Sequence, residues 1–288
     1  MKIPRLFGDG KPVFSFEFFL PKTPEDTLAF KDTVRELKGL APSFVTLTYG
    51  AGGSARERTI ETAALIQNEI GLETAAHLTC IGHTRDEVAS ILDRIEAAGI
   101  ENIVALRGDP PRDQPPPPLE SREFRYAADL VGFIRARGRF ALAVAGYPEK
   151  HPEAPDAESD LAHLKAKVAA GGDWIITQLF FDNRDYFAFV RRAREAGIAC
   201  PIVPGIMPVT SFQQTRRFTT MCGAKLPGAM LEDLSRIQDD KEAVVRYGVE
   251  HATRQCRDLL AGGAPGIHFY TLNRSHSTAT ILARLKDL

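Results

Sequence analysis

Residues 84–109 read TRDEVASILDRIEAAGIENIVALRGD, a helical pattern followed directly by a strand pattern. Between Thr84 and Ala98 the apolar side chains recur at helical spacing and form one stripe, with charged side chains opposite. Gly99 stands where such a helix is expected to end. The run NIVALRGD at 102–109 is nearly continuous in apolar residues, which is typical of a strand buried on both faces of a parallel sheet. The stretch therefore predicts one helix–strand unit of an α/β fold.

This unit repeats along the chain. Other apolar runs of the same character lie at 13–19, 44–50, 73–80, 141–148, 173–180, 201–208 and 266–273. Successive runs start 28–39 residues apart, except for a last step of 65 residues. Eight such units predict an α/β protein with a (β/α)8 TIM barrel, formed by residues 1–288 as a single domain. An open, doubly wound sheet is the alternative.

Two of the connections are irregular. The 65-residue step is long enough for extra helices, which we expect near 210–221, 229–237 and 240–261. The step after the fourth strand contains PPRDQPPPPLE at 110–120, and its prolines exclude regular secondary structure there.

Composition excludes several classes of function. The chain has 36 basic and 37 acidic residues, so its net charge of −1 argues against nucleic acid or an anionic membrane surface as a partner. Its four cysteines form no CxxC pair, so neither a zinc site nor a disulfide framework is expected, and we predict no metal. The first ten residues lack the apolar stretch of a signal peptide, and no run is long enough to cross a bilayer. We therefore predict a cytoplasmic protein.

The polar residues that follow the predicted strands are the natural candidates for chemistry, because in a β/α barrel all strand ends converge on one rim. They are Glu17, Thr48, Tyr49, His77, Arg107, Asp109, Tyr147, His151, Gln178, Tyr270 and Arg274.

Glu17 and Asp109 are the candidate catalytic residues. Glu17 lies among phenylalanines in FSFEFFLP, and apolar surroundings should raise its pKa and prepare it to act as a general acid. The alternative is a glutamate that is only paired with a nearby arginine. Asp109 follows Gly108, which allows a ligand to approach the backbone closely. The alternative for Asp109 is a turn cap before the prolines.

A cofactor site is suggested by the helix after the fifth strand. Asp160, His163 and Lys167 are spaced by three and four residues and share one helix face, which suits a phosphate-bearing cofactor or, alternatively, a solvated surface. The chain contains neither a GxGxxG nor a GxxxxGK[ST] motif. A nucleotide cofactor would therefore be held by the loops of the barrel.

At this point the residues resemble a known family. FEFFLPK at 16–22, VTLTYGAGG at 45–53, IVALRGD at 103–109, YPEKHPEA at 147–154, ITQLFFD at 176–182 and FYTLNRS at 269–275 resemble methylenetetrahydrofolate reductases. The resemblance runs from about residue 11 to 285 and is to the bacterial type, which consists of the catalytic barrel only. On this basis S-adenosylmethionine inhibition is not expected.

The resemblance implies an enzyme of one-carbon metabolism and methionine biosynthesis. It implies bound FAD and reduction of 5,10-methylenetetrahydrofolate to 5-methyltetrahydrofolate by NADH or NADPH in a ping-pong reaction through FAD, with a homo-oligomer as the expected assembly. The alternatives are another flavin barrel oxidoreductase, such as a proline dehydrogenase, and a folate-binding barrel without catalysis.

The resemblance also implies roles for individual positions. Glu17 resembles the general acid and Asp109 the aspartate between flavin and pterin. Contacts with the substrates are implied for Asp109, Gln178, Tyr186, Phe218, Tyr270 and Arg274, with Tyr186 and Phe218 near the aryl portion and Arg274 at the glutamate tail. Positions that bind the flavin are implied at Thr48, Tyr49, Ala51, His77, Arg107, Gly108, Asp109, Tyr126, Ala127, Tyr147, His151, Ala154, Asp160, His163 and Lys167.

Two of the positions on the cofactor helix depart from the bacterial pattern. Ala166 stands where relatives carry a basic residue near the FAD phosphates, and His163 replaces an asparagine. We therefore expect FAD to be held less tightly than a full set of phosphate contacts would hold it.

Overall fold

The computed structural model describes residues 1–21, 23–49, 53–109 and 118–286. Its strands form one parallel sheet that curls into a barrel, in the order β7-β6-β5-β4-β3-β2-β1-β9-β8. The first six strands are β1 (Val13–Phe18), β2 (Phe44–Leu47), β3 (Thr74–Thr79), β4 (Asn102–Leu106), β5 (Ala141–Gly146) and β6 (Trp174–Thr177). They are followed by β7 (Ile202–Val203), β8 (Gly205–Ile206) and β9 (Gly266–Tyr270). The predicted α/β barrel is confirmed, and the open sheet is excluded because β8 pairs with β9.

The seventh predicted strand is divided at one residue. β7 pairs with β6 and β8 pairs with β9, so residues 202–206 close the ring as two short pieces. Pro204 lies between them and has no N–H to donate, although its carbonyl accepts a hydrogen bond from His268 at 2.9 Å. Within the described residues the sheet therefore has nine strands, where the sequence pattern predicts eight.

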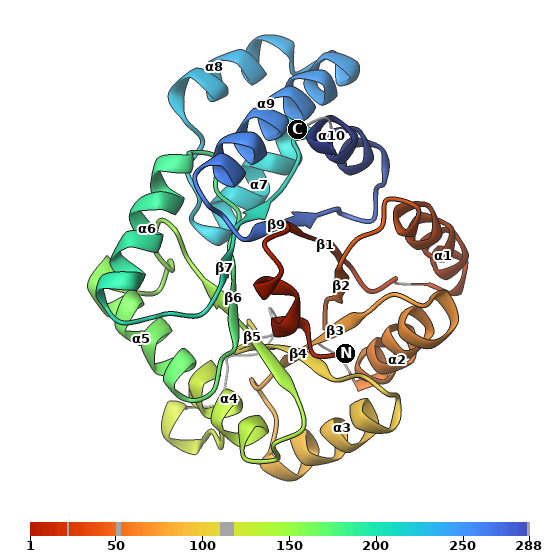
Figure 1. Cartoon of the computed structure of the whole chain (residues 1–288), viewed down its shortest axis with the longest axis vertical. Coiled ribbons are helices and arrows are strands. Elements are labelled where there is room, and N and C mark those ends of the chain that lie inside the picture. The colour runs from red at the N-terminus through yellow and green to blue at the C-terminus, as the bar shows by residue number, and fades with distance from the viewer. Residues whose placement is uncertain (22, 50–52, 110–117, 287–288) are drawn as a thin grey trace.

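The helices surround the strands (Figure 1). Those that follow β1 to β6 are α1 (Pro24–Lys38), α2 (Gly53–Ala64) with its π-helical extension η2 (Leu65–Ile70), α3 (Arg85–Ala97), α4 (Ala127–Arg135), α5 (Ala157–Ala169) and α6 (Asn183–Glu195). A 3-10 turn, η3 (Leu119–Ser121), precedes α4. The predicted extra helices are present as α7 (Phe212–Cys222), α8 (Gly228–Ile237) and α9 (Lys241–Ala261), and α10 (His276–Lys286) ends the ring.

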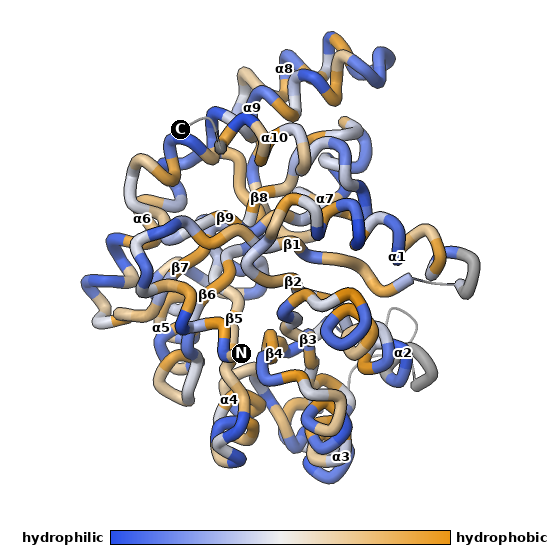
Figure 2. The backbone as a smooth tube through the Cα atoms, turned by 45° about the vertical axis from the view of Figure 1, so that its right-hand side comes forward, coloured by the Kyte–Doolittle hydropathy of each residue, from blue (hydrophilic) through white to orange (hydrophobic). Residues whose placement is uncertain are grey.

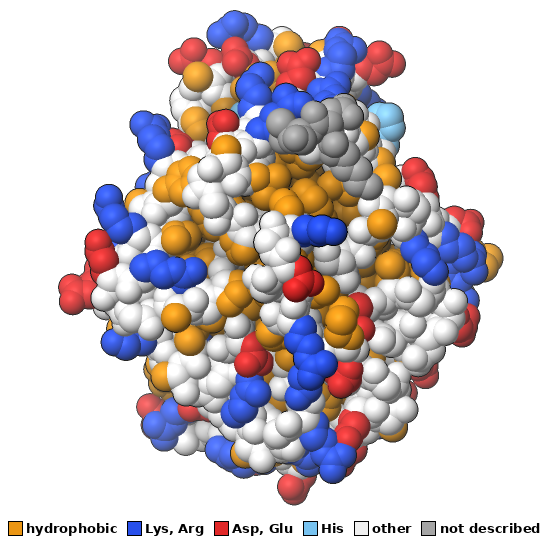
Figure 3. Space-filling view, viewed as in Figure 1, with side chains coloured by type: hydrophobic (Ala, Val, Ile, Leu, Met, Phe, Trp, Pro, Cys, Tyr) orange, Lys and Arg blue, Asp and Glu red, His pale blue; other side chains and the backbone are white. Residues whose placement is uncertain are grey.

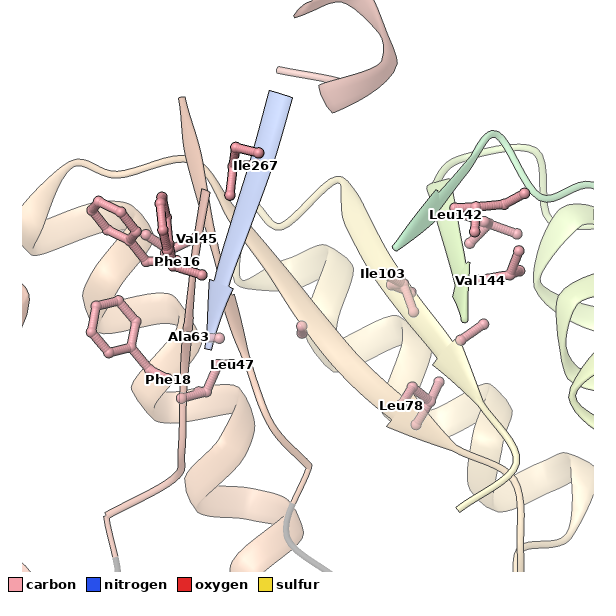
Figure 4. Packing of buried hydrophobic residues seen from close by; sticks show 14 of the residues in the cluster. Phe16, Phe18, Val45, Leu47, Ala63, Leu78, Ile103, Leu142, Val144 and Ile267 are labelled. Atoms are coloured by element: carbon pink, nitrogen blue, oxygen red, sulfur yellow. The ribbon is translucent and has the colours of Figure 1, made fainter. Parts of the chain in front are cut away.

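Burial follows the alternation of each strand. Phe16 and Phe18 project from the same side of β1 into the layer between strands and helices (Figure 4). Val13, by contrast, packs inside the barrel with Phe44 and Trp174, below the 3-10 turn η1 (Ile3–Gly8) that closes this end. The strands are mostly hydrophobic along their length, whereas the helices alternate between hydrophobic and hydrophilic residues (Figure 2). Side chains of Ser15 and Glu17 therefore point to the barrel interior.

The end of the barrel that η1 closes carries scattered charges and one apolar hollow (Figure 3). This hollow of about 600 Å³ lies among Pro12, Phe14, Leu260, Ala261 and Leu285, together with Arg257 and Asp258. None of the residues that the sequence proposes for chemistry lines it. Among the described residues, no helix is both long and apolar enough to cross a membrane.

Candidate active site

Glu17 lies at the centre of a buried polar cluster inside the barrel. Its Oε2 is 3.3 Å from Nε2 of His77 on β3 and 3.4 Å from Nε2 of His268 on β9. The hydroxyl of Thr46 on β2 donates to the same oxygen at 3.4 Å, and the Glu17 side chain is only 12% exposed. Four adjacent strands, β1, β2, β3 and β9, thus aim polar groups at one carboxylate.

The prediction that the pKa of Glu17 is raised is wrong. Burial does raise the pKa of Glu17, but the charge of His77 and the hydrogen bonds from His268 and His77 outweigh burial and lower it to about 2. The sequence prediction of a raised pKa considered only the flanking phenylalanines. Those rings, Phe16 and Phe18, point away into the outer layer. The alternative prediction paired Glu17 with an arginine, but its partners in the structure are the two histidines His77 and His268.

Three residues of this cluster are not among the candidates that were predicted from the sequence. They are Ser15, Thr46 and His268. Nδ1 of His268 lies 2.8 Å from the hydroxyl of Ser15, which stands two residues before Glu17 on the same face of β1. The alternation of the strand would have identified Ser15 and, one strand away, His268 two residues before Tyr270. The signal in the sequence is a polar residue at a strand position that the alternation directs into the barrel.

The residues predicted to bind flavin at the end of β4 are arranged around one ion pair. Both terminal nitrogens of Arg107 bind the carboxylate of Glu153, with Nη2 2.7 Å from Oε1. Gly108 has a φ of +83°, and a Cβ there would lie 2.8 Å from Thr79 Cβ. The glycine is thus required by its neighbours in the fold, whereas the sequence suggested a ligand as the reason. Asp109 is exposed beside them.

The positions after β5 are connected to this ion pair. The ring of Tyr147 lies 4.6 Å from that of His151, whose Nδ1 accepts a hydrogen bond from the Glu153 N–H at 3.1 Å. The N–H of His151 donates to Asp160 on α5 at 3.2 Å. Burial raises the pKa of Tyr147 to about 12, and burial lowers the pKa of His151. Ala154, 7% exposed, ends the same loop.

Lys167 of α5 reaches strand β5 with its ammonium group. Its Nζ donates to the carbonyl of Ala145 at 2.5 Å. Burial lowers the pKa of Lys167 to about 8, partly offset by Asp160. The predicted face of α5 therefore points to the barrel, with Asp160 and Lys167 directed at the β5 loop.

His163, on the same helix, meets a residue of the preceding one. Its ring stacks on that of Tyr126 with centroids 6.1 Å apart and an interplanar angle of 17°. Tyr126 is the N-cap of α4 and is 50% exposed, and Ala127 is the first residue of that helix. An asparagine at position 163, as in the bacterial pattern, would lack this stack.

The remaining residues that are predicted to bind flavin lie after β2 and on β3. Thr48 accepts a hydrogen bond from the Leu20 N–H at 3.2 Å, and its own N–H donates to the Phe18 carbonyl at 2.9 Å. The hydroxyl of Tyr49 is 3.4 Å from Nε2 of His83. His77 is the partner of Glu17 described above, and Ala51 lies outside the described residues.

Three of the predicted substrate residues lie around a small hollow at the rim or beside it. Gln178 lines the hollow together with Tyr147 and Cys222. The hydroxyl of Tyr270 donates to the carbonyl of Thr177 at 2.7 Å, next to Gln178. Phe218 of α7 packs at the edge of the apolar cluster that joins α7, α8 and α9 to the strand ends.

Arg274 is exposed in the turn after β9. Its N–H donates to the carbonyl of Thr271 at 2.9 Å, and the hydroxyl of Thr271 donates to the carbonyl of Glu17 at 2.6 Å. The predicted tail-binding residue and the predicted acid are therefore joined through one short turn.

Tyr186 does not lie at the rim, and the expectation that it contacts substrate is corrected. It is 2% exposed, its ring stacks on Phe180 at 5.7 Å, and its hydroxyl donates to the carbonyl of Ile202 at 2.8 Å. The tyrosine thus fastens α6 to the outer face of the barrel. Helical spacing places it on the buried side of α6, which residue type alone does not reveal.

The fold is shared with proteins of known structure. A Clostridium thermocellum protein that binds two copies of 5-methyl-5,6,7,8-tetrahydrofolic acid matches with a TM-score of 0.68 at 13% identity, over 100% of this chain and 98% of that chain. A dihydropteroate synthase from Xanthomonas albilineans matches with a TM-score of 0.52 at 14% identity, over 96% of this chain and 93% of that chain. At these identities the likeness concerns the fold alone.

Relatives in sequence are much nearer. A methylenetetrahydrofolate reductase (NADH) of Zea mays is 42% identical over 99% of this chain and 50% of its own length. A 5,10-methylenetetrahydrofolate reductase of Salmonella typhimurium is 41% identical over 94% of this chain and 90% of its own length, and that of Escherichia coli is 40% identical over the same shares. The chain spans about half the length of the plant relatives it matches. The family model for methylenetetrahydrofolate reductase matches residues 2–286, and with the Glu17 cluster and the rim now described, the chain belongs to the methylenetetrahydrofolate reductase family.

Proposed function

We propose that this chain reduces 5,10-methylenetetrahydrofolate to 5-methyltetrahydrofolate, with FAD as cofactor and NADH or NADPH as reductant. The observation that carries the proposal is the Glu17 carboxylate, which two histidines hold at the centre of the barrel in a chain of this family. The name of the Zea mays relative supports NADH as reductant. A homo-oligomer and a cytoplasmic location stay predictions.

The residues at the rim fit FAD by their chemistry. Arg107 and Lys167 supply two cations for a diphosphate, and the Tyr126–His163 stack offers an aromatic surface beside them. Lys167 pays a desolvation cost in the barrel that a bound phosphate would offset. Ala166 adds no charge, so retention of FAD should depend on Lys167 more than it would in relatives that carry a basic residue at position 166. FAD, when bound, supplies the hydride chemistry, accepting a hydride from the nicotinamide and giving one to the folate.

The chain's own contribution to folate reduction is a proton. Opening the methylene bridge requires protonation of N10 of the folate, which leaves a cationic iminium at N5. Because the pKa of Glu17 is low, the carboxylate is ionised near neutral pH, and the imidazoles of His77 and His268 are the groups within reach that can pass it a proton. A folate bound against Glu17 would desolvate the carboxylate further and raise its pKa, so that a proton would pass from an imidazole through Glu17 to N10.

Asp109 would act on the charge that this step creates. Its exposed carboxylate at the end of β4 would stabilise the cationic iminium electrostatically. Gln178, which lines the rim hollow, would orient the folate and the nicotinamide in turn. Successive use of one place by both substrates leads to ping-pong kinetics.

Two half-reactions, followed by flavin absorbance without oxygen, test the proposal. The FAD-loaded protein should be bleached by NADH or NADPH, and methylenetetrahydrofolate should then restore the absorbance. Bleaching without restoration by folate would favour another flavin oxidoreductase, and folate binding by a protein that takes up no FAD would favour a folate-binding barrel without catalysis.

A further inference from the structure

One large aromatic side chain at the rim has no place in the function described so far. Phe19 follows β1 and is 40% exposed, although Phe16 and Phe18 before it are fully buried. An exposed phenylalanine leaves apolar surface in water, and at the edge of a binding site such a surface is available to a ligand.

The hydrogen bonds along β1 and just past its end indicate which way Phe19 faces, although those of Phe19 itself are made to the side chain of Asn273. Within a parallel ladder, residues that bond to one neighbouring strand alternate with residues that bond to the other. Glu17 accepts from Thr271 beyond β9, and Phe18 accepts from Thr48 beyond β2. Phe19 again bonds on the β9 side, through Asn273. The alternation of β1 therefore continues past its end, and Phe19 stands on the same face as Glu17.

Phe19 is also held in place. The side-chain amide of Asn273 accepts from the Phe19 N–H at 2.8 Å and donates to the Phe19 carbonyl at 2.9 Å. On the next residue, Thr48 accepts the N–H of Leu20 at 3.2 Å. Both sides of the segment are thus fixed, one from β9 and one from β2.

The turn that supplies Asn273 is strained. Leu272 and Asn273 have φ values of +52° and +56°, a region that costs free energy for residues other than glycine and is disfavoured most for bulky ones. Thr271 accepts the Asn273 N–H at 3.2 Å and donates to the Glu17 carbonyl. The strained turn is therefore the one that hydrogen-bonds to the backbone of both Glu17 and Phe19. Backbone strain of this kind clusters at functional sites.

We propose that Phe19 is the aromatic wall against which the p-aminobenzoyl ring of the folate packs, and that Asn273 is the residue that positions it. This inference rests on the proposed function. A step of two residues along a strand is about 7 Å, so Phe19 stands one side chain above Glu17. In the proposed function Glu17 passes a proton to N10, and N10 carries the p-aminobenzoyl ring. The ring nearest Phe19 is therefore this one. Of the two predicted aryl contacts, Tyr186 is buried elsewhere, and Phe218 of α7 is left as the other aromatic residue for the same ring.

The test compares two ligands on the FAD-loaded protein. In Phe19→Leu the dissociation constant of tetrahydrofolate should rise about threefold to tenfold, the usual worth of an aromatic contact beyond its area. The constant of 6-methyltetrahydropterin, which lacks the aryl ring, should not change. Phe187→Leu is the matched control, because Phe187 is 36% exposed on α6 and belongs to no part of the site. It should alter neither constant.

Asn273→Gly isolates the positioning role, because glycine accepts a positive φ without strain but cannot hold the Phe19 backbone. It should raise the tetrahydrofolate constant as Phe19→Leu does, while the rate of flavin reduction by NADH and the urea midpoint stay near wild type. Equal losses for both ligands, or an equal loss in flavin reduction, would overturn the proposal and assign Phe19 to the pterin, the cofactor or the fold. If wild type reduces methylenetetrahydrofolate and Phe19→Leu binds tetrahydrofolate normally, only this inference fails. A wild-type protein that binds no folate removes the proposed function itself.

Discussion

Oε2 of Glu17 lies 3.3 Å from Nε2 of His77, so an acid that the sequence places among phenylalanines is in fact the partner of an imidazole. The same oxygen lies 3.4 Å from His268, and the pKa of Glu17 is lowered to about 2 despite its burial. A carboxylate in this state does not hold its own proton near pH 7. In the proposed function the cluster of Glu17, His77 and His268 therefore acts as one unit that passes a proton to the folate.

Replacement of Glu17 by glutamine should separate the two half-reactions. Glutamine keeps the size of the side chain but cannot pass a proton to N10, so folate reduction should fall by about 10²–10⁴-fold. Reduction of the flavin by NAD(P)H needs no proton at the folate and should continue. Anaerobic stopped-flow absorbance measures each rate. An equal fall in both rates would mean that Glu17 supports the flavin or the fold.

Glu17 should also make stability depend on acid pH. The pKa of Glu17 is about 2 in the folded protein against an ordinary value of 4.5, so its ionised form contributes stability above pH 4.5 that is lost as pH falls through 2. The contribution is about 3 kcal/mol. The wild-type advantage over Glu17→Gln in free energy of unfolding should shrink over this range, as urea titrations at several pH values would show. A constant difference would contradict the paired carboxylate.

Lys167 should strengthen the binding of FAD and lower the free energy of unfolding of the FAD-free protein. Burial lowers the pKa of Lys167 from 10.5 to about 8, so its charged form costs stability below pH 8, and the cost is relieved as pH rises to 10.5. At pH 7, Lys167→Met should therefore raise the free energy of unfolding of the FAD-free protein by about 1–2 kcal/mol.

The same variant should bind FAD at least about tenfold more weakly, because a charge-assisted hydrogen bond contributes about 1.5 kcal/mol or more to the free energy of binding. Fluorescence quenching of the flavin measures the affinity. Lys165→Met, two residues away and exposed, is the control and should change neither quantity. Undiminished FAD affinity in Lys167→Met would remove this lysine from the cofactor site.

Arg274 should contribute to folate affinity and not to the chemical step. Its side chain is exposed, so loss of a contact with the folate glutamate in Arg274→Ala should cost about 1 kcal/mol and raise the folate KM about fivefold at similar kcat. Steady-state kinetics with varied folate would show this. Arg246→Ala, on the outer face of α9 with a side chain 64% exposed, should leave KM unchanged. If Arg274→Ala does the same, the residue does not bind the tail.

Gly108 should tolerate no side chain. Its φ of +83° and the close approach of Thr79 Cβ and Ile81 Cγ2, at 2.8 and 2.9 Å from a Cβ, combine backbone strain with a steric clash. We expect Gly108→Ala to lower the free energy of unfolding by at least about 2 kcal/mol. Gly138→Ala has a φ of +70° and open space, so its loss should be nearer 1 kcal/mol. Urea midpoints at constant slope measure both, and equal losses would mean that the clash is absorbed.

The fold could be predicted from the sequence because its signals are local. The spacing of apolar runs, the helical stripe in 84–98 and the position of Gly99 require only neighbouring residues, and they led to the barrel and to the helices α7, α8 and α9. The division of one strand at Pro204 was also within reach, since proline has no N–H to donate.

The state of the active site was decided by the tertiary structure. Glu17, His77 and His268 lie on three strands, and only the closed sheet brings the rings within 3.4 Å of the carboxylate, so the direction of its pKa shift depends on partners up to 251 residues away. The prediction that Tyr186 contacts the substrate was wrong for the same reason, since the burial of Tyr186 depends on which face of α6 packs against the barrel. Sequence thus determined which residues occupy the strand ends. Burial and distance, which set solvation and charge, existed only once the barrel had closed.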